Sequence, residues 1–217
     1  MVCTGHTWKE ILEKVDLVEN EIIRPLSNPW NPWGSLSVLK GNLAHKGSIS
    51  KPTAVDPALH RFRGPALCFN SEEEATQAVM SGELKPGMVL VIRYEGPKGG
   101  PGMREMVRIM KLIYGLGLAS STAVITDGRF SGTNNGCFVG HISPEASEGG
   151  PIAYLQNGDI ITIDVHEGIL EADVSKEEME RRKASYVKPD KKIPNGYLNI
   201  YARLAESADK GAIIKNR

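Results

Sequence analysis

The chain has 217 residues, of which 41% are hydrophobic and 24% charged, as in an ordinary globular protein large enough to bury a core. Lysine plus arginine and aspartate plus glutamate number 26 each, so the formal net charge is zero, and no basic field favours nucleic acid or an anionic membrane surface. No apolar run approaches the ~18 residues that span a bilayer, and the amino end lacks the apolar core of a signal peptide. We therefore expect a cytoplasmic protein that binds neither nucleic acid nor membranes.

The cysteines argue against a metal or cluster site held by this chain alone. Cys3, Cys68 and Cys137 are an odd number, widely spaced, with no Cys-x-x-Cys pair, so they form no disulfide framework. Iron–sulfur and structural zinc sites usually take at least two ligands from one short segment. We expect three free, mostly buried thiols.

The sequence divides into an amino-terminal segment (1–34), a central domain (35–186) and a carboxyl-terminal linker and helix (187–217). The first segment has a capping-box spacing and helical apolar periodicity that predict a helix over 7–19, followed by a proline-rich connector. Trp30 and Trp33 lie in this connector. Local burial of the two rings is the commoner outcome for such residues, and a partner-recognition motif is the alternative.

The central domain opens with short β-like runs at 36–39, 49–55 and 66–69. A second capping-box spacing predicts an amphipathic helix from Ser71 to Gly82. The continuous apolar run 88–92 has the length of a strand buried on both faces.

A glycine-rich loop, residues 95–103, follows that strand and leads into a helix whose apolar stripe indicates core packing. Free N–H groups at a helix N-terminus bind anions, so Gly99, Gly100 and Gly102 are candidates for holding an anionic substrate. The loop fits neither the Walker pattern nor G-x-G-x-x-G, so nucleotide binding is weakly supported. A phosphate-binding enzyme that uses residues 96–102 is one alternative function.

A second glycine-rich loop, Thr126-Asp-Gly-Arg-Phe-Ser-Gly132, follows the apolar run 121–125. A strand that fixes position and small residues that allow close backbone approach are how a reactive side chain is commonly presented, which makes Ser131 a candidate. The alternative is a surface turn with a solvated serine.

The remaining runs predict an antiparallel meander over 152–155, 160–165 and 169–174. Ser175, three residues before Glu178, is expected to cap a charged, exposed helix that ends near residue 185. A final helix over 197–208 follows. The pattern as a whole predicts a mixed α/β domain rich in β-structure, with the two glycine loops as walls of a site.

Four segments, 41–44, 92–106, 126–132 and 140–153, resemble the dihydroxy-acid dehydratase and phosphogluconate dehydratase family in order and spacing. The string Arg-Tyr-Glu-Gly-Pro-Lys-Gly-Gly-Pro-Gly-Met-Arg-Glu-Met looks most like dihydroxy-acid dehydratase. The resemblance runs over nearly the whole chain and covers only the carboxyl-terminal part of such an enzyme.

The resemblance implies a swivelling β/β/α, barrel-like domain with peripheral helices. It closes over a larger amino-terminal domain that holds an iron–sulfur cluster and supplies most ligands of a Mg²⁺ ion. The family eliminates water from a 2,3-dihydroxy acid to give a 2-keto acid, in branched-chain amino-acid biosynthesis for the dihydroxy-acid branch. We accordingly expect three partners: the amino-terminal cluster domain of the same enzyme, a hydroxy-acid substrate, and further copies of the chain in a homo-oligomer. We also expect the isolated chain to be inactive. The cluster cysteines of the family are absent from this chain.

In the family the proposed base is the serine of the Asp-Gly-Arg-Phe-Ser-Gly motif, which falls on Ser131. A serine hydroxyl is a weak acid, so Mg²⁺ and the N–H groups of Gly132 and Thr133 would have to activate it. Glu105 matches the family glutamate that is a candidate Mg²⁺ ligand. The alternative is a solvated glutamate in the first turn of a helix, on its polar face.

Arg129, Lys98 and His141 rank below these candidates, because surface ion pairs and structural histidines explain most such residues. The chain is therefore expected to be the carboxyl-terminal domain of a dihydroxy-acid dehydratase. The alternatives are a sugar-acid or 6-phosphogluconate dehydratase of the same family, and a non-catalytic subunit or binding module.

Overall fold

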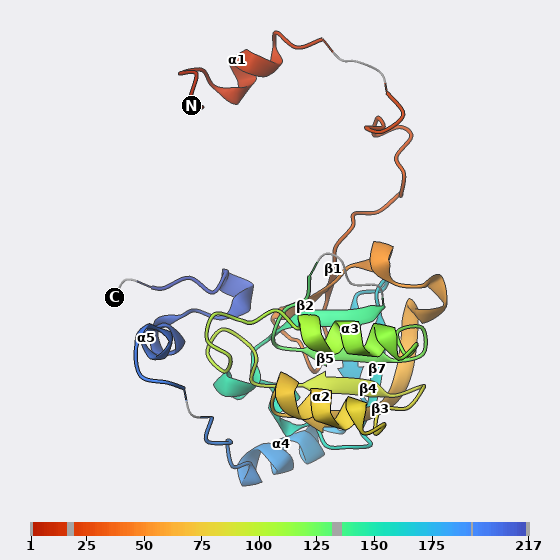
Figure 1. Cartoon of the computed structure of the whole chain (residues 1–217), viewed down its shortest axis with the longest axis vertical. Coiled ribbons are helices and arrows are strands. Elements are labelled where there is room, and N and C mark those ends of the chain that lie inside the picture. Colours follow the sequence, from red (N-terminus) through yellow and green to blue (C-terminus); the bar gives the residue numbers. More distant parts are fainter. Residues whose placement is uncertain (1, 17–19, 132–135, 192, 216–217) are drawn as a thin grey trace. The chain divides into compact units, whose positions relative to one another are not determined.

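The computed structural model describes residues 2–16, 20–131, 136–191 and 193–215 (Figure 1). They fall into two units, Met1–Gly34 and Ser35–Arg217. No helix in the described part of the chain is long and apolar enough to cross a membrane.

The first unit contains one short helix, α1 (Trp8–Leu12). The capping box is confirmed: the Thr7 hydroxyl accepts from Glu10 N–H, and the Glu10 carboxylate accepts from Thr7 N–H. The predicted extension to residue 19 is wrong, because α1 ends at Leu12 and buries none of its residues. A helix without a packing surface is marginal beyond a turn or two.

The two connector tryptophans are exposed in this unit. Trp30 and Trp33 expose 65% and 61% of their surface, so the expected local burial is wrong. The Arg24 guanidinium lies 3.6 Å from the centroid of the Trp30 ring, and the Trp30 indole donates to the Ile22 carbonyl. These contacts stabilise the connector locally without excluding water from the rings.

The second unit is built on one eight-stranded sheet in the order β1-β2-β6-β5-β4-β3-β7-β8. The strands are β1 (Ser37–Leu39), β2 (Gly47–Ser50), β3 (Arg61–Phe69), β4 (Val89–Ile92), β5 (Ala123–Thr126), β6 (Cys137–Ser143), β7 (Ile160–Asp164) and β8 (Ile169–Ala172). The central strands β3, β4, β5 and β6 are parallel, and all the outer pairings are antiparallel.

The two edges of the sheet meet, so the sheet is almost closed into a barrel. Lys40, directly after β1, forms a parallel bridge with Ile169 of β8. Its N–H donates to the Gly168 carbonyl and its carbonyl accepts from Leu170 N–H, both at 2.8 Å. This closure satisfies backbone groups that an open edge would expose. It confirms the predicted β-rich, barrel-like α/β fold.

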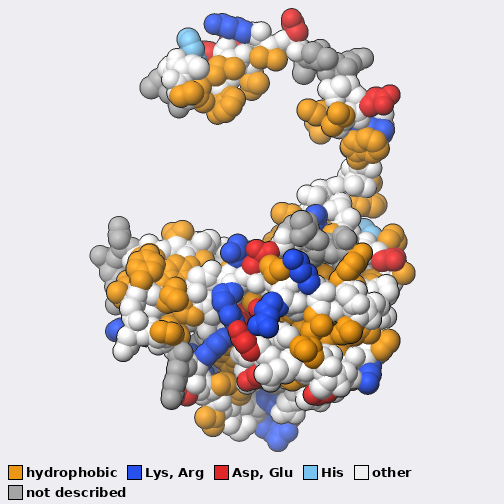
Figure 2. Space-filling view, in the orientation of Figure 1, with side chains coloured by type: hydrophobic (Ala, Val, Ile, Leu, Met, Phe, Trp, Pro, Cys, Tyr) orange, Lys and Arg blue, Asp and Glu red, His pale blue; other side chains and the backbone are white. Residues whose placement is uncertain are grey.

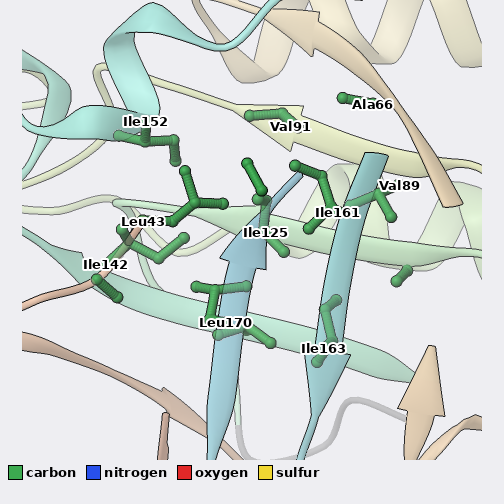
Figure 3. Close-up of a cluster of buried hydrophobic side chains, with 14 of the residues drawn as sticks. Leu43, Ala66, Val89, Val91, Ile125, Ile142, Ile152, Ile161, Ile163 and Leu170 are labelled. Atoms are coloured by element: carbon green, nitrogen blue, oxygen red, sulfur yellow. The ribbon is translucent and has the colours of Figure 1, made fainter. Parts of the chain in front are cut away.

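Two apolar clusters fill the two sides of the sheet. Figure 3 shows the cluster inside the barrel, to which strands far apart in sequence contribute, including Val91, Ile125, Ile161 and Leu170. The second cluster includes Leu90 and lies under helices α2 (Glu72–Met80) and α3 (Val107–Gly115), which pack side by side (Figure 1). Successive β4 residues point into opposite clusters, which explains why the whole strand is apolar and buried, as predicted.

The other two helices lie outside the core. Ser71 and Ser175 are confirmed as N-caps of α2 and α4 (Lys176–Ser185), each accepting from the N–H three residues later. The predicted exposure of α4 is confirmed, since none of its residues is buried. The final helix, α5 (Tyr197–Leu204), ends before the residue predicted, and a short 3₁₀ turn at Ala208–Lys210 follows.

Three predictions of strands need correction. Residues Pro151–Tyr154 form a 3₁₀ turn that proline begins, so the meander reduces to the β7–β8 hairpin. β2 ends at Ser50, because Pro52 opens another 3₁₀ turn. The sequence did not predict β6, whose apolar run Gly140 and His141 interrupt.

Candidate active site

The polar loops of this protein meet at one edge of the barrel. Because β4, β5 and β6 are parallel neighbours, their carboxyl ends lie together, and the loops that follow Ile92, Thr126 and Ser143 start from that edge. Ligands of parallel α/β sheets bind outside the carboxyl ends of the strands. We refer to this place as the carboxyl edge.

Asp127 joins the three loops. It is fully buried, directly after β5. Its Oδ1 accepts from Glu95 N–H at 2.9 Å, and its Oδ2 accepts from Tyr94 N–H at 3.1 Å and from Ala146 N–H at 2.8 Å. One carboxylate therefore connects the end of β5 to the loops after β4 and β6.

The predicted anion loop holds a carboxylate of the chain itself. Glu145 is 1% exposed and accepts from Lys98 N–H and Gly99 N–H, both at 2.9 Å. The Gly100 N–H donates to the Gly96 carbonyl at 2.8 Å. Donation of these N–H groups within the chain fixes the loop, and the role of Gly99 and Gly100 toward substrate stays a prediction.

The glycines at this edge are required by close packing. A Cβ at Gly99 would lie 2.5 Å from Ser147 Oγ, and one at Gly100 would lie 2.6 Å from Glu95 Oε2. Gly102 has a φ of 88° and is exposed, with open space where a Cβ would be. Glycine is therefore needed at 99 and 100 for space and at 102 for backbone conformation.

Glu95 is a third carboxylate at the carboxyl edge and is fully buried. It accepts from Arg104 Nη2 at 3.2 and 3.3 Å and from Glu72 N–H at 3.0 Å, and it pairs with Lys191 Nζ at 3.2 Å. Arg104 also forms a bidentate pair with Glu73. Figure 2 shows basic and acidic side chains gathered on this face, between helices α3 and α5 of Figure 1.

Burial raises the pKa values of two of these carboxyl groups. Loss of hydration is the main cause: it raises the pKa of Asp127 to about 6 and the pKa of Glu145 to about 7. The backbone N–H groups that donate to each carboxylate oppose this rise. The neighbouring Asp127 charge raises the Glu145 pKa further. Two coupled acids that titrate near neutral pH are typical of active sites.

The structure brings the segment of Glu105 against the serine loop. Glu105 forms a parallel β-bridge with Arg129, Met106 N–H donates to the Arg129 carbonyl at 2.9 Å, and Arg129 Nε donates to the Met103 carbonyl at 2.7 Å. Ser131 follows two residues after Arg129. The predicted metal ligand and the predicted base therefore come from adjoining segments.

Glu105 does not lie in the first turn of a helix. Helix α3 begins at Val107, so the alternative of a helix-stabilised glutamate is wrong. The Glu105 side chain is half-buried, and no hydrogen bond or ion pair engages it within the described part of the chain. A half-buried carboxylate without a counter-charge is a ready ligand for a cation.

Ser131 is half-buried at the end of a described segment. The preceding residue, Phe130, packs on Phe138 of β6 with ring centroids 5.1 Å apart, which fixes the approach to the serine. Gly132 and Thr133, predicted to donate N–H groups, lie outside the described residues.

Backbone strain gathers at the same edge. Tyr94, Met103 and His141 have φ values of 63°, 53° and 58°, in the left-handed region that non-glycine residues rarely adopt. Such residues persist where surrounding contacts hold them, and they cluster at functional sites. All three lie on the loops or strand ends that flank Glu105 and Ser131.

The three lower-ranked residues have structural contacts at this edge. Lys98 pairs with Glu148, and Arg129 binds the Met103 carbonyl. Burial and the charge of Arg129 lower the pKa of His141, so the imidazole is neutral near pH 7.

A cavity of about 490 Å³ lies beside the glycine loop, lined among others by Tyr94, Lys98, Gly99, Lys191 and Arg203. A second, of about 300 Å³, is lined by residues that include Glu95, Gly100 and Arg104. Neither Ser131 nor Glu105 lines these two cavities.

Comparison with known proteins gives one consistent result. The profile described as "Dihydroxy-acid/6-phosphogluconate dehydratase C-terminal" matches residues 21–212. The chain belongs to this family. Dihydroxy-acid dehydratases of Clostridium botulinum (strain Alaska E43 / Type E3), Methanococcus aeolicus and Anaeromyxobacter dehalogenans are 50%, 48% and 47% identical to it, over 98%, 98% and 100% of this chain. The chain covers 38%, 38% and 39% of those proteins, about two-fifths of their length.

The residues of this dehydratase-family chain fit one of the two implied cofactors. The open Glu105 carboxylate suits Mg²⁺, which prefers one or two protein carboxylates. Cys68 and Cys137 do not suit a cluster, because burial raises their pKa values to about 11 and about 12 and keeps the thiols protonated. They lie on β3 and β6, which β4 and β5 separate in the sheet. Among the described residues no group of three His, Cys, Asp or Glu side chains is arranged to hold a metal.

Sequence reasoning missed the buried carboxylates Glu95, Asp127 and Glu145. A signal was present, because each acid follows the carboxyl end of a parallel strand by one to three residues, and glycine directly follows Glu95 and Asp127. The alternation of apolar and polar residues along the sequence could not predict their burial, since this burial depends on loops that meet only in the folded chain.

Proposed function

We propose that this chain supplies the carboxyl-terminal part of the active site of a dihydroxy-acid dehydratase. The reaction would eliminate water from a 2,3-dihydroxy acid to give a 2-keto acid, as in branched-chain amino-acid biosynthesis. The observation that carries the proposal is the β-bridge between Glu105 and Arg129, which joins the segment of the candidate metal ligand to the segment of the candidate base in a chain of this family.

In this proposal Ser131 takes the proton from C2 of the substrate. Its hydroxyl must be near a positive charge and oriented donors to act as a base. The N–H groups of Gly132 and Thr133 are the proposed donors. Phe130 limits movement of the loop, because its ring is held by Phe138.

Glu105 would hold Mg²⁺, together with ligands from the amino-terminal part of the enzyme. When bound, this ion supplies positive charge that stabilises the developing enolate and the deprotonated serine. The chain's own contribution is a half-buried carboxylate whose backbone is fixed beside Arg129. The iron–sulfur cluster implied by the resemblance is assigned to ligands outside this chain.

Of the three predicted anion-loop glycines, Gly102 is the one that is exposed. We therefore assign contact with the substrate carboxylate to the loop around Gly102. Gly99 and Gly100 would fix the conformation of this loop, since their N–H groups donate to Glu145 and Gly96.

The proposal extends to the setting of the enzyme. A cytoplasmic homo-oligomer is proposed, in which this domain swivels over the cluster-bearing part. The chain alone would be inactive, because its described residues offer one proposed metal ligand and no fitting cluster site.

The test is turnover of 2,3-dihydroxy-3-methylbutanoate by this chain alone and by a protein in which it is joined to the amino-terminal three-fifths found in its relatives. We expect the 2-keto acid only from the joined protein, and only with Mg²⁺ present. Turnover by the chain alone, or none by the joined and cofactor-loaded protein, would contradict the proposal.

6-Phosphogluconate is the second candidate substrate, because the matching family description names it. The relatives quoted above are dihydroxy-acid dehydratases, which favours the first candidate. Comparison of kcat/KM for the two substrates in the joined protein decides between them.

A further inference from the structure

The proposed chemistry needs loops from different strands to keep a fixed geometry. Ser131 lies on the loop after β5, and Glu105 on the loop after β4. Displacement of reacting groups by about 1 Å can cost a factor of about 100 in rate. The residue that fixes these loops to each other therefore affects the reaction even without touching substrate.

Asp127 has the contacts that this task requires. Both of its oxygens accept backbone N–H groups, from Glu95 on Oδ1 and from Tyr94 and Ala146 on Oδ2. The donors belong to the loops after β4 and β6, whereas Asp127 itself stands four residues before Ser131. The three loops at the carboxyl edge thus share one carboxylate.

The fold alone does not call for a charge at this position. Asp127 is 0% exposed, and burial of a carboxylate is unfavourable even when N–H groups are donated to it. Its neighbour Glu95 adds a repulsive charge. The contacts of Asp127 also hold Tyr94 in its left-handed conformation, with a φ of 63°.

We propose that Asp127 is a positioning residue of the dehydration reaction: it aligns the Ser131 loop with the Glu105 segment by binding the backbone of the loops after β4 and β6. The proposal rests on the proposed function, in which Ser131 and Glu105 take part in catalysis. It assigns Asp127 no contact with substrate or metal.

The substitution Asp127→Asn separates positioning from bulk. Asparagine keeps the size but has one acceptor oxygen, so its NH₂ group would face either Glu95 N–H or the Tyr94 and Ala146 N–H groups. At least one loop is then released. Where Asp127→Asn folds poorly, Ala146→Pro is the milder variant, because it removes one donor at the first position of a 3₁₀ turn, where proline is tolerated.

The chain offers a matched control in Asp164→Asn. Asp164 ends β7, and its Oδ1 alone accepts from His166 N–H and Glu167 N–H. Asparagine can keep both bonds there. Asp164 pairs in register with Arg61 at the start of β3, so it lies at the amino end of the parallel strands, away from the carboxyl edge.

Two measurements test the proposal. In the joined, cofactor-loaded protein, we expect Asp127→Asn to lower kcat about 10- to 100-fold, with KM within about threefold of wild type, and Ala146→Pro to lower kcat less. In Asp127→Asn, amide hydrogen exchange should accelerate at residues 128–131 and at the residues whose N–H groups lose their acceptor, either 95 or both 94 and 146. Asp164→Asn should change neither readout at these residues.

Three other results would each contradict a different part of the proposal. If Asp127→Asn accelerates exchange at these residues but keeps kcat within about twofold of wild type, the positioning role is wrong. If exchange accelerates at none of residues 94, 95 and 146, the shared-carboxylate geometry is wrong. If the wild-type joined protein shows no dehydration, the proposed function fails, and the exchange data alone still decide whether Asp127 aligns the loops.

Discussion

The two ends of the barrel differ in how deeply they bury acidic residues. At the carboxyl edge, Glu95 and Asp127 are 0% exposed and accept backbone N–H groups from distant segments. At the opposite end, where β4 begins and which we call the amino edge, the side chain of Asp173 is 73% exposed, and that of its partner Arg63 is 61% exposed. This ion pair therefore remains solvated.

Backbone hydrogen bonds of Lys40 close the barrel, so buried charge at the carboxyl edge serves another purpose. Exposed pairs contribute little to stability, about 0–1 kcal/mol each, but cost little as well. A buried carboxylate costs more and fixes loop geometry in return. Strained backbone at Tyr94, Met103 and His141 marks the same edge. Substitutions at the two edges test this contrast.

The largest effect is expected from Ser131→Ala at the carboxyl edge. Loss of a general base typically lowers rate by about 10²- to 10⁴-fold, so kcat in the joined protein should fall by that order. Ser175→Ala is the control, because Ser175 caps the exposed helix α4, and its loss should cost about 1 kcal/mol of stability without lowering kcat. Equal kcat values for the two variants would remove Ser131 from the mechanism.

Glu105→Gln should have the next largest effect. The amide keeps the shape but removes the charge that attracts a hard cation, so kcat should fall roughly 100-fold and the Mg²⁺ concentration for half-maximal activity should rise. The control is Glu180→Gln, on an exposed part of α4. An unchanged Mg²⁺ titration in Glu105→Gln would argue that the carboxylate has a structural role only.

Gly100→Ala should destabilise the protein by about 1–3 kcal/mol, because the new Cβ would lie 2.6 Å from Glu95 Oε2 and 2.9 Å from Glu95 Cα. Gly115→Ala is the control at the end of α3, where a Cβ meets nothing within 4 Å, and it should be neutral or stabilising by up to about 1 kcal/mol. Urea unfolding measures both. A neutral Gly100→Ala would mean that the loop packs less tightly than the structure shows.

The last effect concerns pH and is comparable in size to that of Gly100→Ala. The pKa of Glu145 is about 7 in the folded chain against an ordinary value of 4.5, so the folded state holds its proton more tightly. Stability should therefore fall as pH rises from about 4.5 to about 7 and level off above, by up to about 3 kcal/mol. Glu145→Gln should flatten this dependence in urea unfolding between pH 5 and 8. A variant that keeps the wild-type slope would show that Glu145 ionises freely.

The sequence predicted the parts of the fold that depend on local pattern. The strand at Val89–Ile92 is continuous and apolar because both its faces are covered, and the serine caps of α2 and α4 satisfy helix N–H groups locally. β6 was not predicted, because Gly140 and His141 interrupt its apolar run, although the neighbouring elements bury the strand. Strand identity there is decided by tertiary pairing.

The candidate site, too, was predicted only in part, because some of its contacts depend on tertiary structure. Ser131 and Glu105 were named from a resemblance, and the structure adds that their segments adjoin through Arg129. The binding of Glu145 by Lys98 and Gly99 could not be predicted, since the partners are 46 or 47 residues apart. Such contacts depend on strand order, which local pattern does not encode.

The most direct test locates the metal relative to the two edges. In the joined protein with methyl-labelled methionine, Mn²⁺ replaces Mg²⁺, and line broadening is compared for Met103 and Met106, which flank Glu105, and for Met88, which precedes β4 at the amino edge. We predict strongest broadening at Met103 and Met106, weaker broadening at Met88, and loss of this order in Glu105→Gln. Broadening that is equal at the three methyls or strongest at Met88 would contradict the assignment of the active site to the carboxyl edge.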